Sequence, residues 1–169
     1  LSDGTEAGNR AAFFQIGSFM ALWIIGYGAV QAWAPKLLGA AGKPLSGIAR
    51  LAALWVGVLS VIPLALAAAA WAAGGPQDWL TLTLVAGLML FGFVFAVNSS
   101  VHSYLILAFT QAERVTMDVG FYYMSNAAGR LLGTLLSGLS YQVGGLPLCL
   151  ATAGAMAGLS FLIVRRLEG

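Results

Sequence analysis

Residues 119–141 read VGFYYMSNAAGRLLGTLLSGLSY, and this stretch decides what kind of protein the chain is. It is long enough to cross a bilayer, which takes about 20 predominantly apolar residues. Its single charge is Arg130, near the middle. An ionised side chain at the bilayer centre costs roughly 3 kcal/mol on insertion scales, so such a residue usually faces a cavity, a partner or a substrate. Asn126 lies one helical turn before Arg130 and Thr134 one turn after it, on roughly the same side. This pattern indicates a membrane protein that handles an anion.

The composition agrees with a membrane protein and excludes an ordinary soluble domain. Hydrophobic residues make up 60% of the 169 residues and charged residues 8%, whereas soluble domains carry about 25% charged residues. The mean hydropathy is +0.88. A net charge of +2 is too small to indicate a nucleic-acid partner.

Several chemistries lack the residues that they need. One histidine and one cysteine, Cys149, cannot form a metal site or an intrachain disulfide. The stretch GAAGKP at 39–44 has the wrong glycine spacing for a phosphate-binding loop. The sequence therefore predicts no metal site, no cofactor and no ATPase activity.

Five apolar stretches predict five transmembrane helices, at residues 11–34, 51–73, 79–109, 119–141 and 145–164. Glycine and proline mark the breaks between them, most clearly in GGPQ at 74–77 and GG at 144–145. The predicted organisation is an outer polar segment at 1–10 followed by a five-helix membrane bundle over 11–169. The predicted fold class is an all-α membrane protein.

Basic residues are distributed unevenly between the two sides of this bundle. Six of the eight fall on one side, and Arg130 lies within a span, so that Arg10 is alone on the other side. Because basic loops are retained in the cytoplasm, we expect an inner-membrane protein with its N-terminus outside and its C-terminus inside. The six are Lys36, Lys43, Arg50, Arg114, Arg165 and Arg166. An odd number of spans with the N-terminus outside, together with a first residue, Leu1, that is not Met, also predicts that part of the protein is missing.

The fourth and fifth stretches resemble a known family of transporters. Gly129, Gly133 and Gly138 in AGRLLGTLLSGLSYQVGG, before a last helix ending Val-Arg-Arg, resemble the final two helices of the major facilitator superfamily. The loop APKLLGAAGKPLSGIAR at 34–50 resembles the basic loop between helices eight and nine, without the acidic residue of the stronger motif. The resemblance covers essentially the whole chain. It implies helices eight to twelve of twelve, with a missing N-terminal half as partner.

Two strings carry a narrower resemblance within that superfamily. NSSVHSYLILAFT at 98–110 and VGFYYMSNAAGRLLGTLLSG at 119–138 look like the organoarsenical-efflux permeases of arsenic-resistance operons. That resemblance implies export of a phosphoglycerate that carries arsenate as an acyl ester, and so arsenic resistance. The residues by themselves imply only a small organic anion. A trivalent arsenic site would need two or three thiolates, which this chain lacks.

Small residues recur every four positions along the fourth stretch, and polar residues lie beside them. Ser125, Gly129, Gly133 and Ser137 form a strip that predicts close packing against a neighbouring helix. Arg130 is predicted to face the bundle interior and to bind an anion, because its planar guanidinium matches a carboxylate or phosphate in two-point contact. The alternative is a structural ion pair or a bond to backbone carbonyls.

Four further residues are candidates for substrate binding besides Arg130 and its neighbour Asn126. Asn98 and His102 share a face of the third stretch, and His102 can donate to an anion or take up a proton. A plain interhelical hydrogen bond is the alternative for His102. Tyr27 and Gln31 end a stripe of aromatic and amide side chains on the first stretch, which core packing would also explain.

These residues support a secondary transporter that exports a small organic anion, with no catalytic residues. A second interpretation is a non-transporting membrane scaffold or assembly subunit, whose polar groups bond only to one another. A third is an intramembrane enzyme that uses His102 and Ser103. Adjacent residues on a helix point about 100° apart, which disfavours that pair as base and nucleophile. A cavity lined by Arg130 and His102 would favour transport over both alternatives.

Overall fold

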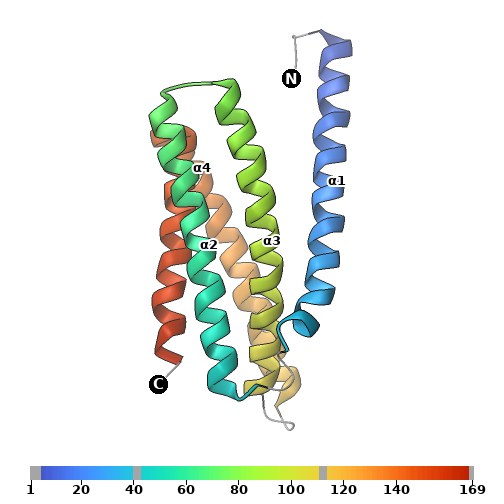
Figure 1. Cartoon of the computed structure of the whole chain (residues 1–169), viewed down its shortest axis with the longest axis vertical. Coiled ribbons are helices and arrows are strands. Elements are labelled where there is room, and N and C mark those ends of the chain that lie inside the picture. The colour runs from blue at the N-terminus through green and yellow to red at the C-terminus, as the bar shows by residue number, and fades with distance from the viewer. Residues whose placement is uncertain (1–4, 40–42, 111–113, 168–169) are drawn as a thin grey trace.

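Four long helices follow one another in the computed structural model, which describes residues 5–39, 43–110 and 114–167 (Figure 1). They are α1 (Glu6–Leu37), α2 (Leu45–Ala73), α3 (Asp78–Phe109) and α4 (Val115–Val164), and the short 3₁₀ turn η2 (Arg165–Leu167) follows. The described residues contain no strand, so the predicted all-α class is confirmed. All four helices are long and apolar enough to cross a membrane, which is typical of a multi-pass membrane protein.

The helix ends follow local chemistry that hydropathy alone does not show. The Thr5 hydroxyl accepts a hydrogen bond from the Gly8 backbone N–H at 3.0 Å, so that α1 begins at Glu6 rather than at residue 11. Similarly, α2 begins directly after Pro44, earlier than predicted. It ends at Gly74, whose φ of 63° lies in the left-handed region that favours glycine.

The long helix α4 is broken in its second half. Gly144 and Gly145 leave helical geometry, and Gly145 has φ 62° and ψ −157°, a conformation open essentially to glycine alone. Ser137 Oγ and Cys149 Sγ lie only 3.3 Å apart, whereas a straight helix would separate residues at that spacing by about 18 Å. The chain therefore reverses direction at the predicted break. We call residues 115–143 the first leg and residues 146–164 the second leg.

The helices alternate in direction, which gathers the basic residues at one end of the bundle. α1, α3 and the second leg descend in Figure 1, while α2 and the first leg ascend. Lys36 at the end of α1, Lys43 before α2, Arg114 before α4 and Arg165 after it therefore share one end. We call this the basic end. Asp78, at the start of α3, lies at the opposite end.

The core is built around α2, which packs against both α3 and the second leg. Its buried positions recur with helical spacing and include five alanines, Ala49, Ala52, Ala53, Ala67 and Ala70. Small side chains let helices approach closely, which gives the van der Waals contact that drives association in lipid. Towards the basic end the buried cluster also takes in Val101 of α3 and Val164 of α4.

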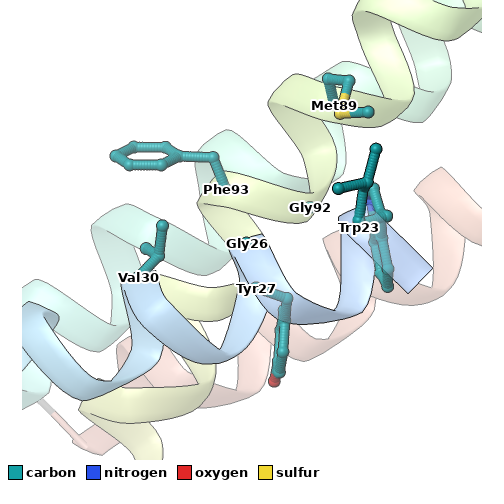
Figure 2. A pocket seen from close by; sticks show the side chains of 8 residues that line it. Trp23, Gly26, Tyr27, Val30, Met89, Gly92 and Phe93 are labelled. Atoms are coloured by element: carbon teal, nitrogen blue, oxygen red, sulfur yellow. The ribbon is translucent and has the colours of Figure 1, made fainter. Parts of the chain in front are cut away.

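Two glycines make the tightest contacts between helices. A Cβ at Gly154 would lie 2.5 Å from Leu64 Cγ and 3.2 Å from the Leu64 backbone nitrogen, so the second leg lies directly on α2. A Cβ at Gly92 would lie 2.5 Å from Trp23 Nε1. The Trp23 indole of α1 thus covers the α3 backbone at Gly92 (Figure 2), and its Nε1–H donates to the Leu88 carbonyl at 3.3 Å.

The predicted packing of the small-residue strip is wrong for this chain. Ser125, Gly129, Gly133 and Ser137 are all exposed, and no atom lies within 4 Å of a Cβ built at Gly129 or Gly133. The four-residue spacing shows which face of a helix can approach a neighbour closely, but it does not supply that neighbour. Within the described residues, Gly154, Gly92 and Gly87 make close approaches to side chains of neighbouring helices instead.

We expect Gly154→Val to destabilise the bundle, because the new Cβ overlaps Leu64 Cγ at 2.5 Å and is held tightly against the Leu64 backbone nitrogen at 3.2 Å. Overpacking of this kind typically costs about 1–3 kcal/mol. The matched control is Gly158→Val on the same leg, where nothing lies within 4 Å of the added Cβ. The measurement is the thermal unfolding midpoint in detergent. Equal midpoints for the two variants would show that the second leg does not pack on α2 at Gly154.

Gly92→Ala should loosen the contact between α1 and α3, because the added methyl displaces the Trp23 indole and its bond to Leu88. The readout is disulfide cross-linking between Gln31→Cys and Ser99→Cys in a Cys149→Ser background, since Gln31 and Ser99 hydrogen bond across the same contact. Gly26→Ala is the control, because its Cβ would meet no atom within 4 Å. Cross-linking that is as fast in Gly92→Ala as in the control would contradict this arrangement.

Candidate functional site

Polar side chains join α1 to α3 beside a row of aromatic rings. Gln31 Nε2 donates to Ser99 Oγ at 3.3 Å, and Ser100 Oγ donates to the Gln31 carbonyl at 3.3 Å. One turn earlier on α1, the Tyr27 ring lies 5.7 Å from the Phe95 ring. Tyr27 and Gln31 therefore face the part of α3 from Phe95 to Ser100, which contains Asn98. These two candidates are placed beside the third-stretch candidates by the fold.

Asn98 is a buried amide whose oxygen lacks a partner. The residue is 8% exposed, and its Oδ1 has no hydrogen-bond donor among the described residues. Leaving such a group unpaired costs about 1–3 kcal/mol, so it normally has an explanation such as a bound water or ligand. Trp55 Nε1 on α2 is a buried donor in the same condition. Sequence analysis missed Trp55, because an aromatic residue inside a span is usually part of the apolar core.

The hydrogen bond of His102 indicates which of its two ring nitrogens carries the hydrogen. His102 Nδ1 lies 3.0 Å from the Asn98 carbonyl oxygen, one turn earlier on α3. Because a carbonyl oxygen only accepts, Nδ1 carries the hydrogen, and Nε2 of the neutral ring is left as an acceptor. His102 also lines an open groove with Phe109, Thr110 and Asp118, which lies in the first turn of α4. The predicted ability of His102 to bind or release a proton therefore concerns Nε2.

Arg130 and Asn126 lie apart from these residues. Both are exposed on the first leg of α4, which is exposed along most of its length. The Arg130 guanidinium makes no hydrogen bond or ion pair within the described part of the chain, and Thr134 donates to the Arg130 backbone carbonyl at 2.9 Å instead. The prediction that Arg130 faces the bundle interior is therefore wrong for this chain. The structural ion pair considered as its alternative is also absent from the described residues.

The pocket between α1 and α3 does not account for the predicted substrate-binding residues. Trp23, Tyr27 and Met89 line it around Gly26 and Gly92 (Figure 2), and its volume is about 180 Å³. Ligand pockets usually have about 300–1,000 Å³. Because its walls are almost entirely apolar and it is small, we exclude it as the site of a polar ligand.

The candidates thus form two separate surfaces. Tyr27 and Gln31 lie at the contact between α1 and α3, Asn98 and His102 lie on the adjoining turns of α3, and Asn126 and Arg130 lie on the first leg of α4. No hydrogen bond or ring contact joins the two sets within 5–39, 43–110 and 114–167. The same residues contain no group of three histidine, cysteine or acidic side chains that could hold a metal ion.

Comparison of the chain with models of protein families, with curated proteins and with solved structures finds no match.

Proposed function

We propose that the chain belongs to a secondary transporter for a small organic anion, in which the first leg of α4 presents Arg130 to the substrate. The observation that carries this proposal is the position of Arg130. It lies near the middle of a helix leg that has few contacts with the other described residues. A guanidinium in contact with lipid at that depth costs roughly 3 kcal/mol on insertion scales, so further protein or a water-filled cavity covers this face.

The resemblance to the major facilitator superfamily implies that a missing N-terminal half covers the face of the first leg that carries Arg130. The exposed strip Ser125, Gly129, Gly133 and Ser137 fits the same proposal, because small residues permit close approach of a helix from outside this chain. The chain would then supply five crossings, since the first and second legs of α4 each cross once. The second leg alone is about 28 Å long at 1.5 Å per residue, close to the roughly 30 Å of a hydrocarbon core.

The proposed orientation places the basic end in the cytoplasm of a cell with the protein in its inner membrane. The cations that flank the helix ends there include Lys36, Lys43, Arg114 and Arg165. Short loops rich in lysine and arginine are retained on the cytoplasmic side. This orientation puts the Gly74 turn and the break at Gly145 outside.

The substrate that fits these residues is an oxygen-rich anion. The free guanidinium of Arg130 can form two parallel bonds with a phosphate or carboxylate, and Asn126 lies one turn away. Asn98 Oδ1 is an acceptor and would bind a hydroxyl group of the substrate, and His102 Nε2 would donate to an anionic oxygen only once it is protonated. An arsenylated phosphoglycerate, as the narrower resemblance implies, has such oxygens, and its export would confer arsenic resistance. Tyr27 and Gln31 would support the α3 residues from α1.

A membrane scaffold is the second candidate, and one observation favours it. Gln31, Ser99 and Ser100 bond to one another across the contact between α1 and α3, as expected of polar groups that only hold helices together. A scaffold role does not explain why the Arg130 guanidinium and the Asn98 side-chain oxygen lack partners among the described residues. An intramembrane enzyme that uses His102 and Ser103 has no supporting contact among the described residues.

We expect cysteine labelling to find the basic end in the cytoplasm. In a Cys149→Ser background, Ser46→Cys and Thr116→Cys should react with a membrane-impermeant maleimide only after cells are permeabilised. Gln77→Cys, at the opposite end, should react in intact cells. None of these substitutions removes a basic residue, so the charges that set the orientation are kept. Labelling of positions 46 and 116 in intact cells would reverse the proposed orientation.

Substitution of Arg130 should weaken binding of the anion. A charged hydrogen bond contributes roughly 1.5–3 kcal/mol, so Arg130→Gln should lose about one to two orders of magnitude in affinity. Arg130→Lys keeps the charge but loses the planar fork and should lose less. The measurement is equilibrium binding of phosphorylated and arsenylated anions to the purified full-length protein.

The control for this experiment is Arg10→Gln, which removes an exposed cation near the start of α1. Thermal unfolding of each variant separates loss of binding from loss of folding. Under the scaffold proposal, Arg130→Gln changes stability or assembly and no anion binds to the wild-type protein. Unchanged affinity in Arg130→Gln would end the proposal that this residue binds the substrate.

A further inference from the structure

An apolar groove runs between α2 and the second leg of α4, and its mouth lies at the basic end. Its volume is about 600 Å³. The Phe161 ring packs over Gly57, where a Cβ would lie 3.2 Å from it, so this ring of the second leg forms one wall of the groove. Beyond Gly57 the groove continues along α2 over Val58 and Val61. This groove shares none of the residues proposed to bind the transported anion.

Two guanidinium groups lie at the mouth of this groove. Arg50 of α2 and Arg165 after the second leg both line it and are exposed. The Arg165 guanidinium lies 5.6 Å from the centroid of the Phe161 ring, a cation–π contact that holds the cation beside the groove wall. No ion pair joins either arginine to a carboxylate in the described part of the chain, so both charges are available to an anion.

The length of the groove matches one leaflet of a bilayer. From Arg50 to Val61 the lining residues cover eleven helical steps, or about 16 Å at 1.5 Å per residue. The hydrocarbon core of a bilayer is about 30 Å thick, so the groove reaches from the level of the headgroups to about the midplane. Positive charge at one end and an apolar trough of this length are complementary to a single lipid with an anionic headgroup.

We propose that this groove binds an anionic phospholipid from the leaflet at the basic end. The lipid phosphate contacts Arg50 and Arg165, and one acyl chain lies in the trough beside Gly57 and Val61. Basic pockets between membrane helices recognise anionic headgroups in this way. The inference needs only that the helices lie in a membrane, and it holds whether the protein transports an anion or acts as a scaffold.

Two other ligands would use only part of this surface. Inorganic phosphate would contact the arginines but leave the trough empty. A zwitterionic phosphatidylcholine would fill the trough, but its headgroup has no net charge for the arginines to attract. The test therefore compares phosphatidylglycerol, phosphatidylcholine and inorganic phosphate on the same protein.

The first arm of the test measures lipid binding by native mass spectrometry of the detergent-solubilised chain. Phosphatidylglycerol should bind more tightly than phosphatidylcholine. Each of Arg50→Gln and Arg165→Gln should weaken phosphatidylglycerol roughly fivefold, and the double variant about thirtyfold, as expected for one interfacial cation each. Arg166→Gln is the matched control, because it removes a neighbouring exposed cation that does not line the groove. An equal loss in Arg166→Gln would mean unspecific attraction to the basic end and would overturn the proposal.

The second arm fills the trough and leaves both arginines in place. Val61 is 61% exposed, so Val61→Trp should fold normally, yet its ring occupies the acyl-chain path and should weaken phosphatidylglycerol severalfold. Val85→Trp on α3 is the control, at a position 43% exposed and outside the groove. Inorganic phosphate at millimolar concentration should not displace the lipid. Displacement by phosphate, or equal binding by Val61→Trp and Val85→Trp, would show that only the headgroup is recognised and would overturn the proposed groove.

Discussion

The packing of α2 against its two neighbours is the constraint on which the rest of the structure depends. In a bilayer the apolar side chains gain nothing by leaving lipid for protein, so helices hold together only where their surfaces approach closely. The alanines of α2 and Gly154 of the second leg allow that approach, and the Leu64 backbone lies within 3.2 Å of the site of a Cβ at Gly154. The break at Gly145 is needed for the same contact, since it returns the second leg along α2.

This arrangement leaves the first leg of α4 at the periphery, and that position gives Arg130 its significance. A helix that carries a charge at its centre is expensive to expose to lipid, and the proposed transporter has further protein or water cover this exposed face. The contact between α1 and α3 is different in kind. There the Gln31 side chain donates to Ser99 and Ser100 donates to the Gln31 backbone carbonyl, while the buried Asn98 Oδ1 on α3 has no donor among the described residues. The transport proposal depends on the first surface, while the second one supports it through Asn98 and His102.

The predicted sites met different outcomes because they rest on different kinds of information. Tyr27 and Gln31 were predicted from a stripe of side chains on one helix. The structure places both against α3, where Tyr27 contacts the Phe95 ring and Gln31 bonds to the Ser99 hydroxyl. Arg130 and the small-residue strip were predicted to lie inside the bundle, and both are exposed among the described residues of this chain. A periodic pattern of small or polar residues identifies the face of a helix that can pack against a neighbour. Whether that face is packed depends on which other helices are present. The roles of all six residues in substrate binding stay predictions.

The sequence by itself determined the all-helical class, the membrane-spanning lengths and the positions of the breaks. These features depend on hydropathy, on glycine conformations and on charges that are local along the chain. Only the tertiary structure decided that Gly154 and the alanines of α2 make the tight contacts, that Asn98 Oδ1 is buried without a donor and that Arg130 is exposed. It also brought Arg50 and Arg165, which are far apart in sequence, to the mouth of one groove. Such contacts join residues on different helices, and in lipid each is set by the fit of two surfaces rather than by the pattern on either one.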